Sequence, residues 1–294
     1  MLEYGGGMMV RFASNDMIDE LKNLWCECFE GDDEYCRFFF EHYFSCENCV
    51  VFTNDHGEVE AAVHMFRGAV TIGGKPQQVL FLYAGATFAQ HRKKGRLTAL
   101  LGYIEAYCRE QGIGIVSASL EETSRPVCEK NGMRPVVNMR AASMVRNRAE
   151  YTYPCEECGY DEFALMRNEY LNREFNIYWT EKSLRYMHAE MKTSGDIVKV
   201  FIDDCVCYAA YTCLEDELLI RETNCPAKDM SALVDSLCAH IGYKGKVTVY
   251  TRADTILRPE DAISQDTFCY AHIWFIDETL DVEAAEWYIN LTAE

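Results

Sequence analysis

The chain has 294 residues, of which 49% are hydrophobic and 13% aromatic, enough for two packed domains of ordinary size. It carries 28 basic and 47 acidic side chains, and this net charge of −19 at pH 7 disfavours nucleic acids and anionic membrane surfaces as partners. We find no apolar run of about 18 residues and no secretion signal, so we expect a cytoplasmic protein with reduced cysteines.

The first half of the chain is predicted to follow the order β-α-α-β-β-β-α-β-α-β. Apolar residues recur at helical spacing in its helices, whereas its strands are apolar runs bounded by turn residues. The expected strands are 10–13, 49–54, 59–69, 70–74, 79–88, 113–120 and 134–145, and the expected helices are 16–29, 34–44, 97–111 and 122–131. The two strands that flank helix 97–111 require a right-handed crossover and therefore parallel pairing.

A basic segment, residues 91–96, joins the strand 79–88 to this helix. Its four cationic side chains are Arg92, Lys93, Lys94 and Arg96. Positive charge destabilises a helix N-terminus unless an anion is bound there. The first N–H groups of the helix lack partners within it, and Gly95 lets the backbone approach a ligand closely. The segment therefore predicts a diphosphate site, with a solvated turn as the alternative.

The second half begins with a polar connection, residues 147–160, and then roughly repeats the order of the first half. Its expected helices are 161–174, 180–191, 227–241 and 282–289, and its expected strands are 196–203, 206–215, 218–223, 246–251 and 267–275. The counterpart of the basic segment, residues 223–229, lacks the glycine. Acidic residues outnumber basic ones 28 to 14 in this half, which suits substrate selection or dimer contacts.

With this segment and this order of elements, residues 10–145 resemble the GNAT acetyltransferase superfamily. Arg92 takes the first place of that family's acyl-CoA motif and Gly95 its central glycine, while Leu97 stands where a small residue is usual. The tandem layout resembles the enhanced-intracellular-survival type, without its sterol-carrier-like domain. The resemblance implies an α+β fold, an α/β three-layer sandwich around a mixed sheet. A catalytic GNAT domain, 1–146, would precede a degenerate GNAT-like domain, 147–294.

The resemblance also implies acetyl-CoA, or another acyl-CoA, as the donor. Backbone amides from Lys93 to Thr98 would hold its diphosphate, and the side chains of Arg92, Lys94 and Arg96 would reinforce them. Thr87 and Phe88 would pair with the pantetheine arm, and an N–H near Phe88 would stabilise the oxyanion. The predicted cofactor-binding residues are Thr87, Phe88, Arg92, Lys93, Lys94, Gly95, Arg96, Leu97 and Thr98.

The transfer of an acyl group to an amine also needs an acid that protonates the leaving thiolate. Related enzymes often place a tyrosine where this chain has Cys128, and the resembling subgroup has another where this chain has Met133. Cys128 and Tyr83, which lies on the strand leading to the basic segment, are therefore the candidate acids. The alternative for both is a role in core packing.

A base must also accept the proton of the amine. Glu121, which lies where the strand 113–120 ends, is the candidate. Glu122 is an alternative, although its charge also suits a helix N-terminus. His64 could face the acceptor pocket, with a core histidine as the alternative. The C-terminal carboxylate that serves as base in the resembling subgroup would come from Glu294.

Two cysteine pairs, Cys46/Cys49 and Cys155/Cys158, have metal-ligand spacing but lie far apart in the sequence, and we interpret them as unlinked thiols. We therefore predict an acetyl-CoA-dependent N-acetyltransferase without a metal. Its acceptor would be a small, cationic amine, and homodimer formation is left open. One alternative is a non-enzymatic acyl-CoA-binding sensor, favoured by the absent tyrosine. An aminoacyl-tRNA-dependent transferase is another, which the net charge disfavours.

Overall fold

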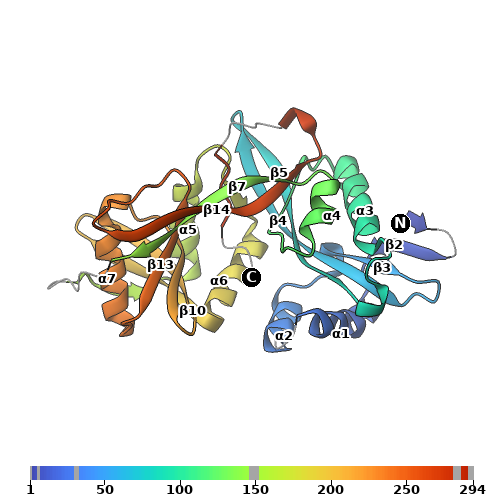
Figure 1. Cartoon of the computed structure of the whole chain (residues 1–294), viewed down its shortest axis with the longest axis horizontal. Coiled ribbons are helices and arrows are strands. Elements are labelled where there is room, and N and C mark those ends of the chain that lie inside the picture. Colours follow the sequence, from blue (N-terminus) through green and yellow to red (C-terminus); the bar gives the residue numbers. More distant parts are fainter. Residues whose placement is uncertain (1, 5–6, 30–32, 146–151, 281–285, 291–294) are drawn as a thin grey trace. The chain divides into compact units, whose positions relative to one another are not determined.

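A computed structural model describes residues 2–4, 7–29, 33–145, 152–280 and 286–290 of the chain (Figure 1). The chain folds into two compact units. Unit 1 comprises Met1–Pro135 and Ala271–Glu283, and unit 2 comprises Val136–Tyr270 and Ala284–Glu294. This division differs from the single cut predicted after residue 146, because the chain returns to unit 1 at Ala271.

Unit 1 contains a mixed sheet with helices on both faces, which confirms the predicted α+β class. Its strands are β1 (Leu2–Tyr4), β2 (Met8–Phe12), β3 (Cys49–Thr53), β4 (Val59–Ile72), β5 (Lys75–Thr87) and β6 (Ile115–Ala118). Its helices are α1 (Ile18–Cys28), α2 (Asp33–His42), α3 (Arg96–Gln111) and α4 (Arg125–Lys130). Neighbouring strands from β1 to β5 pair antiparallel, whereas β5 and β6 pair in parallel, which confirms the predicted crossover.

Two strand boundaries differ from the prediction. The two predicted strands 59–69 and 70–74 merge into one continuous strand, β4, which ends at Ile72. Strand β5 begins at Lys75 rather than at residue 79. Gly73 and Gly74 have φ angles of +57° and +73°, the left-handed conformation that a tight two-residue hairpin turn requires. The hairpin therefore extends several residues beyond the apolar run that the sequence makes visible.

The sheet of unit 1 separates two hydrophobic clusters. Val63 and Met65 of β4 pack in one cluster with Leu100 and Ile104 of α3. Ala62, which points the opposite way on the same strand, belongs to the cluster that includes α1. Figure 1 shows α3 and α4 on one side of β4 and β5 and α1 and α2 on the other. Each fully buried leucine contributes roughly 1.5–3 kcal/mol to this packing.

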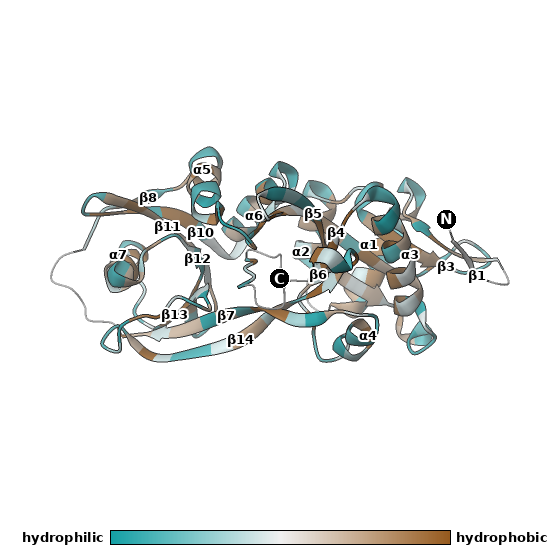
Figure 2. Cartoon of the chain, turned by 90° about the horizontal axis from the view of Figure 1, so that it is seen from above, coloured by the Kyte–Doolittle hydropathy of each residue, from teal (hydrophilic) through white to brown (hydrophobic). Residues whose placement is uncertain are grey.

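Unit 2 also combines a mixed sheet with helices. Its elements are β7 (Arg134–Met144), β8 (Cys155–Glu157), α5 (Tyr160–Leu171), β9 (Ile177–Trp179), α6 (Glu181–Ser194), β10 (Gly195–Ile202), β11 (Cys205–Cys213), β12 (Glu217–Thr223), α7 (Met230–Ile241), β13 (Lys246–Arg252) and β14 (Ala262–Phe275). Strands β12 and β13 are parallel and flank α7, as β5 and β6 flank α3. Figure 2 shows hydrophobic residues along β10 and β11 and a largely hydrophilic visible face on α5.

The two long strands β7 and β14 explain the observed division of the chain. The final residues of β14 pair antiparallel with β6, from His272↔Ala118 to Phe275↔Ile115, and therefore belong to the sheet of unit 1. Residues 139–143 of β7 instead pair antiparallel with β13, in unit 2. Each strand thus starts in one unit and ends in the other, so no single cut separates the units.

The predicted last helix, 282–289, is not present in its described part, residues 286–289. Trp287 and Tyr288 instead form isolated β-bridges with Val137 and Asn176. The buried Asn290 side chain donates a hydrogen bond to the carbonyl of Arg221. These contacts hold the segment in an extended conformation against unit 2, which overrides its helical pattern.

A fully buried ion pair lies next to this segment. Arg167 of α5 donates from Nε to Glu222 Oε1 of β12 at 2.7 Å, and neither side chain is accessible to solvent. The hydroxyl of Tyr208 donates to the same carboxylate at 2.9 Å. Because an unpaired charge is very unfavourable in an apolar core, these partners are needed to keep the charges of Arg167 and Glu222 buried.

Candidate functional site

The paired part of β5 and β6 is short, and a gap opens beyond it. The parallel pairing runs from Val79↔Ile115 to Leu82↔Ala118, while β5 continues to Thr87. Tyr83 pairs with His64 and Ala86 with Ala62, so Ala84 and Gly85 stand opposite the single residue Val63. This is a β-bulge, and Ala84 occupies the left-handed region at φ +46°. The bulge bends β5 at the point where β6 ends.

Two adjoining cavities occupy this gap. The inner cavity has a volume of about 160 Å³ and the outer one about 690 Å³. Both are lined by Phe29, Gly85, Leu97, Glu121, Thr123 and Ser124. Since they share these walls, they form one slot. It runs from the start of α3 to Leu82 and Ala118, where the pairing of β5 with β6 ends.

The N-terminus of α3 forms one wall of the outer cavity. Gly95 is its N-cap, with φ +77°, and among the described residues no atom beyond Gly95, its chain neighbours and the adjoining helix backbone lies within 4 Å of the position that a Cβ would take. The carbonyl of Gly95 accepts the first helical hydrogen bond, from the amide of Ala99 at 3.0 Å. The amides of Arg96, Leu97 and Thr98 are therefore the unpaired first N–H groups of the helix, at a wall that suits an anion.

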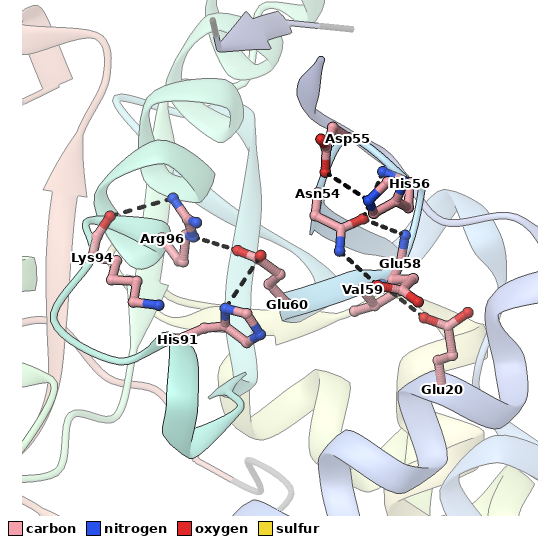
Figure 3. A network of polar contacts seen from close by, with 10 residues as sticks. All are labelled: Glu20, Asn54, Asp55, His56, Glu58, Val59, Glu60, His91, Lys94 and Arg96. Atoms are coloured by element: carbon pink, nitrogen blue, oxygen red, sulfur yellow. Dashed lines mark hydrogen bonds and ion pairs between the residues drawn. The ribbon is translucent and has the colours of Figure 1, made fainter. Parts of the chain in front are cut away.

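The predicted cofactor-binding residues gather at this wall. Seven of them line the outer cavity: Thr87, Arg92, Lys93, Gly95, Arg96, Leu97 and Thr98. The side chains of Lys93 and Lys94 are exposed to solvent. Arg96 instead donates from Nε to Glu60 Oε2 at 2.6 Å (Figure 3). Its guanidinium lies 4.3 Å from the centroid of the Phe52 ring. The Arg96 side chain therefore binds to residues of β3 and β4.

The backbone N–H of Phe88, a predicted oxyanion donor, makes a hydrogen bond within the sheet. Its amide donates to the carbonyl of Glu60 at 3.1 Å, so the Phe88 N–H is already used by β4. Because backbone groups alternate along a strand, those of the neighbouring Thr87 point away from β4 and toward the gap. The carbonyl of Thr87 accepts a hydrogen bond from Arg92 Nε there, at 3.0 Å.

All three predicted catalytic residues, Tyr83, Glu121 and Cys128, line the inner cavity. Glu121 is exposed, and its carbonyl accepts the amides of Ser124 and Arg125 at the start of α4. The neighbouring Glu122 is also exposed. Burial raises the pKa of the Cys128 thiol to about 11, and the nearby charge of Glu129 adds to this shift. Cys128 is therefore a neutral thiol at physiological pH.

The Tyr83 side chain lies on the face of the sheet that α1 and α2 cover. Its hydroxyl donates to the hydroxyl of Tyr35 at 3.0 Å, and its ring centroid lies 5.8 Å from that of Trp25 and 5.7 Å from that of Phe39. Tyr35, in the first turn of α2, is therefore a further residue near the candidate site, and the sequence pattern does not point to it.

His64 and Met133 are core residues. His64 is buried among aromatic rings, with its centroid 4.9 Å from that of Phe39 and 5.7 Å from that of Trp25. Among the described residues, its Nδ1 atom has no hydrogen-bond partner. Burial lowers the pKa of His64 to about 3, so the ring is neutral and a poor proton acceptor. Met133 is also buried. Glu294 lies outside the described residues.

The cysteine pairs of the sequence analysis lie in different units: Cys46 and Cys49 in unit 1, and Cys155 and Cys158 in unit 2. Over the described ranges, no group of three or more His, Cys, Asp or Glu side chains is close enough to hold a metal ion. All fifteen cysteines are free thiols. None of the helices in the described part of the chain combines the length and the hydrophobicity needed to cross a membrane.

Comparisons with known proteins agree with this geometry. Residues 9–126 match the family model of the acetyltransferase (GNAT) domain. A probable N-acyltransferase from Enterococcus faecalis has a similar fold, with a TM-score of 0.72, 12% identity, and coverage of 93% of this chain and 74% of that one. A GCN5-related N-acetyltransferase from Anabaena variabilis shares the same TM-score and coverages at 15% identity.

Eis1 from Mycobacterium abscessus is also similar, with a TM-score of 0.61, 11% identity, and coverage of 92% of this chain and 74% of that one. At these identities the likeness concerns the fold, and it extends over both units. No curated protein matches the sequence.

Proposed function

We propose that the chain is an acetyltransferase that transfers acetyl from acetyl-CoA to the primary amine of a small, cationic acceptor, and the match of residues 9–126 to the family model of the GNAT acetyltransferase domain supports this. The observation that carries this proposal is the slot between β5 and β6, which joins the unpaired amides of α3 to an inner cavity lined by Tyr83, Glu121 and Cys128. The sequence resemblance to the GNAT superfamily is confirmed.

Several features of the slot fit a coenzyme A thioester. The open space over Gly95 and the first amides of α3 suit a diphosphate, with Lys93 and Lys94 nearby as cations. The backbone of Thr87 faces the gap, so the pantetheine arm can pair with it as an added strand. The apolar walls of the inner cavity, among them Leu82 and Leu101, suit the thioester end.

The inner cavity offers a residue for each proton transfer. Glu121, on its solvent-exposed rim, is the proposed base, acting directly or through a water molecule. Cys128, with a pKa of about 11, is a weaker acid than an ordinary tyrosine, whose pKa is about 10. We therefore favour Tyr83 as the acid, with its hydroxyl on the face of the sheet that α1 and α2 cover, where it donates to Tyr35 in the structure. The bulged peptides of Ala84 and Gly85 replace Phe88 as oxyanion donors.

We further propose that unit 2 is the degenerate GNAT-like domain. Pairing of β12 with β13 ends at Ile220↔Val249, the counterpart of the point where the slot opens in unit 1. Just beyond it, Glu222 is buried against Arg167, and the segment 287–290 packs over both. These contacts cover the end of the β12–β13 pairing with residues 287–290, which supports a role for unit 2 other than cofactor binding.

Charge supports the proposed acceptor class. A net charge of −19 attracts cations and repels polyanions, as expected for a polyamine, an aminoglycoside or a lysine-like amine. The cytoplasmic location and homodimer formation stay predictions.

A turnover assay tests the proposed function. Acetyl-CoA is incubated with a panel of such amines, and free thiol is measured over time. We expect thiol release that depends on one of the amines. In Tyr83→Phe, we expect kcat to fall at least tenfold, about 1.4 kcal/mol in the barrier, with the KM for acetyl-CoA unchanged. Binding of CoA without turnover on any amine would favour the sensor alternative, and binding of tRNA at moderate salt would favour the aminoacyl-tRNA alternative.

A further inference from the structure

Glu60 of β4 is a buried carboxylate that the proposed reaction does not use. Its side chain is only 7% exposed, yet it lies against the basic segment (Figure 3). Oε2 accepts a hydrogen bond from Arg96 Nε at 2.6 Å, and Oε1 lies 3.2 Å from His91 Nδ1. A carboxylate is rarely buried unless it is paired, so these contacts account for its position.

The backbone of Glu60 holds the other end of the same segment. Its carbonyl accepts the amide of Phe88 at 3.1 Å, where β5 ends, while its carboxylate binds Arg96, the first residue of α3. One residue of β4 therefore fixes the loop 88–96 at both ends. The cation–π contact of Arg96 with Phe52 of β3 adds a second attachment to the sheet.

We propose that Glu60 is a positioning residue for the diphosphate of the donor, an inference that rests on the proposed function. By holding Arg96 against the sheet, it sets the direction of the first turn of α3 and hence of the unpaired amides at residues 96–98. Phosphate oxygens then meet N–H groups that are already oriented. The loop does not have to be ordered when the donor binds.

A comparison of two donors tests this role. The first is acetyl-CoA, and the second is the acetyl thioester of N-acetylcysteamine, which lacks the nucleotide and the diphosphate. Glu60→Gln keeps the shape of the side chain but removes the charge that holds Arg96. We expect its KM for acetyl-CoA to rise at least tenfold, its KM for the short thioester to change less than twofold, and kcat to stay unchanged.

Glu58→Gln is the matched control. Glu58 lies two residues away, is exposed, and accepts a hydrogen bond from Asn54 Nδ2 at 2.7 Å in the turn before β4. The same change of charge there should leave both KM values as they are. If Glu60→Gln does not fold, Glu60→Asp provides the second test. It keeps the negative charge but shortens the side chain that reaches Arg96, and the same selective loss with acetyl-CoA is expected.

An equal loss with both donors would show a merely structural role for Glu60 and would overturn the inference. So would an unchanged KM for acetyl-CoA in Glu60→Gln and, where that variant does not fold, in Glu60→Asp. In either case the proposed function stands, provided that the unchanged chain binds CoA. If the unchanged chain does not bind CoA, the proposed function fails and this inference with it.

Discussion

At the scale of single residues, the direction of each side chain decides its role, and β5 shows why the sequence leaves this open. The prediction placed Thr87 and Phe88 together against the donor, but only the backbone of Thr87 faces the gap. The register depends on the bulge at Ala84, which lies at φ +46°. A residue other than glycine is uncommon in that conformation, so the alanine gives no warning of it.

The sequence also leaves open which way the His64 side chain points. Its buried surroundings lead to a prediction about how the free energy of unfolding depends on pH. Burial lowers the pKa of His64 to about 3, whereas it is about 6.5 in the unfolded chain. Between these values the unfolded chain takes up the proton and the folded chain does not. The contribution of His64 to the free energy of unfolding is therefore complete above pH 6.5 and decreases as the pH falls toward 3.

His64→Phe should remove this dependence while a ring still fills the aromatic cluster. Between pH 7 and pH 5, we expect the free energy of unfolding to fall by about 2 kcal/mol more in the unchanged chain than in the variant. Urea unfolding at the two pH values measures the difference, and the remaining histidines cancel in the comparison. The same pH dependence in both proteins would show that His64 is accessible to protons in the folded state.

At the scale of elements, the sequence pattern predicted helices and strands correctly wherever an apolar run lay between clear turn residues. The strand–helix–strand unit β5–α3–β6 was predicted with its parallel pairing, because its helix has an apolar stripe and ends at Gly112. The predicted helix 282–289 was wrong in its described part. Its local pattern fits a helix, but β-bridges and the hydrogen bond of Asn290 hold residues 287–290 extended.

The ion pair between α5 and β12 leads to a prediction about the stability of unit 2. Glu222→Leu would leave the guanidinium of Arg167 buried without its carboxylate, and we expect it to lower the free energy of unfolding by about 3–5 kcal/mol. The double variant Arg167→Met/Glu222→Leu removes both charges and should recover most of this loss.

Denaturant unfolding of the three proteins measures these differences. Glu181→Leu is the control. It breaks the exposed i,i+4 pair of Glu181 with Arg185, which should cost less than about 1 kcal/mol. If the double variant were as unstable as Glu222→Leu, the shapes of these side chains rather than their charges would account for the loss.

At the scale of the whole molecule, the number of units followed from length and composition, but their boundaries did not. The chain leaves unit 1 after Pro135 and returns at Ala271, within the continuous strands β7 and β14. Pro135 lies inside the continuous strand β7, and β14 has no turn residue at Ala271, so the sequence alone does not locate these boundaries. The distribution of charge did indicate where to expect the diphosphate site, because the cations of residues 92–96 stand out against a net charge of −19.

The central claim is that the N-terminus of α3 binds the diphosphate of coenzyme A, and two glycines allow a matched test. Gly95, at this N-terminus, has φ +77°, and Gly57, in the turn between β3 and β4, has φ +85°. At both positions the space that a Cβ would occupy is open, because among the described residues only the glycine, its chain neighbours and any adjoining helix backbone lie within 4 Å of it. Alanine should therefore cost each of them a similar backbone strain, about 1–2 kcal/mol.

Calorimetric titration with coenzyme A is the most direct measurement. We expect the unchanged chain and Gly57→Ala to bind with the same affinity, and Gly95→Ala to bind at least tenfold more weakly, because its methyl group occupies the space of the phosphates. The absence of binding heat with the unchanged chain would contradict the account, and so would equal affinities for Gly95→Ala and Gly57→Ala.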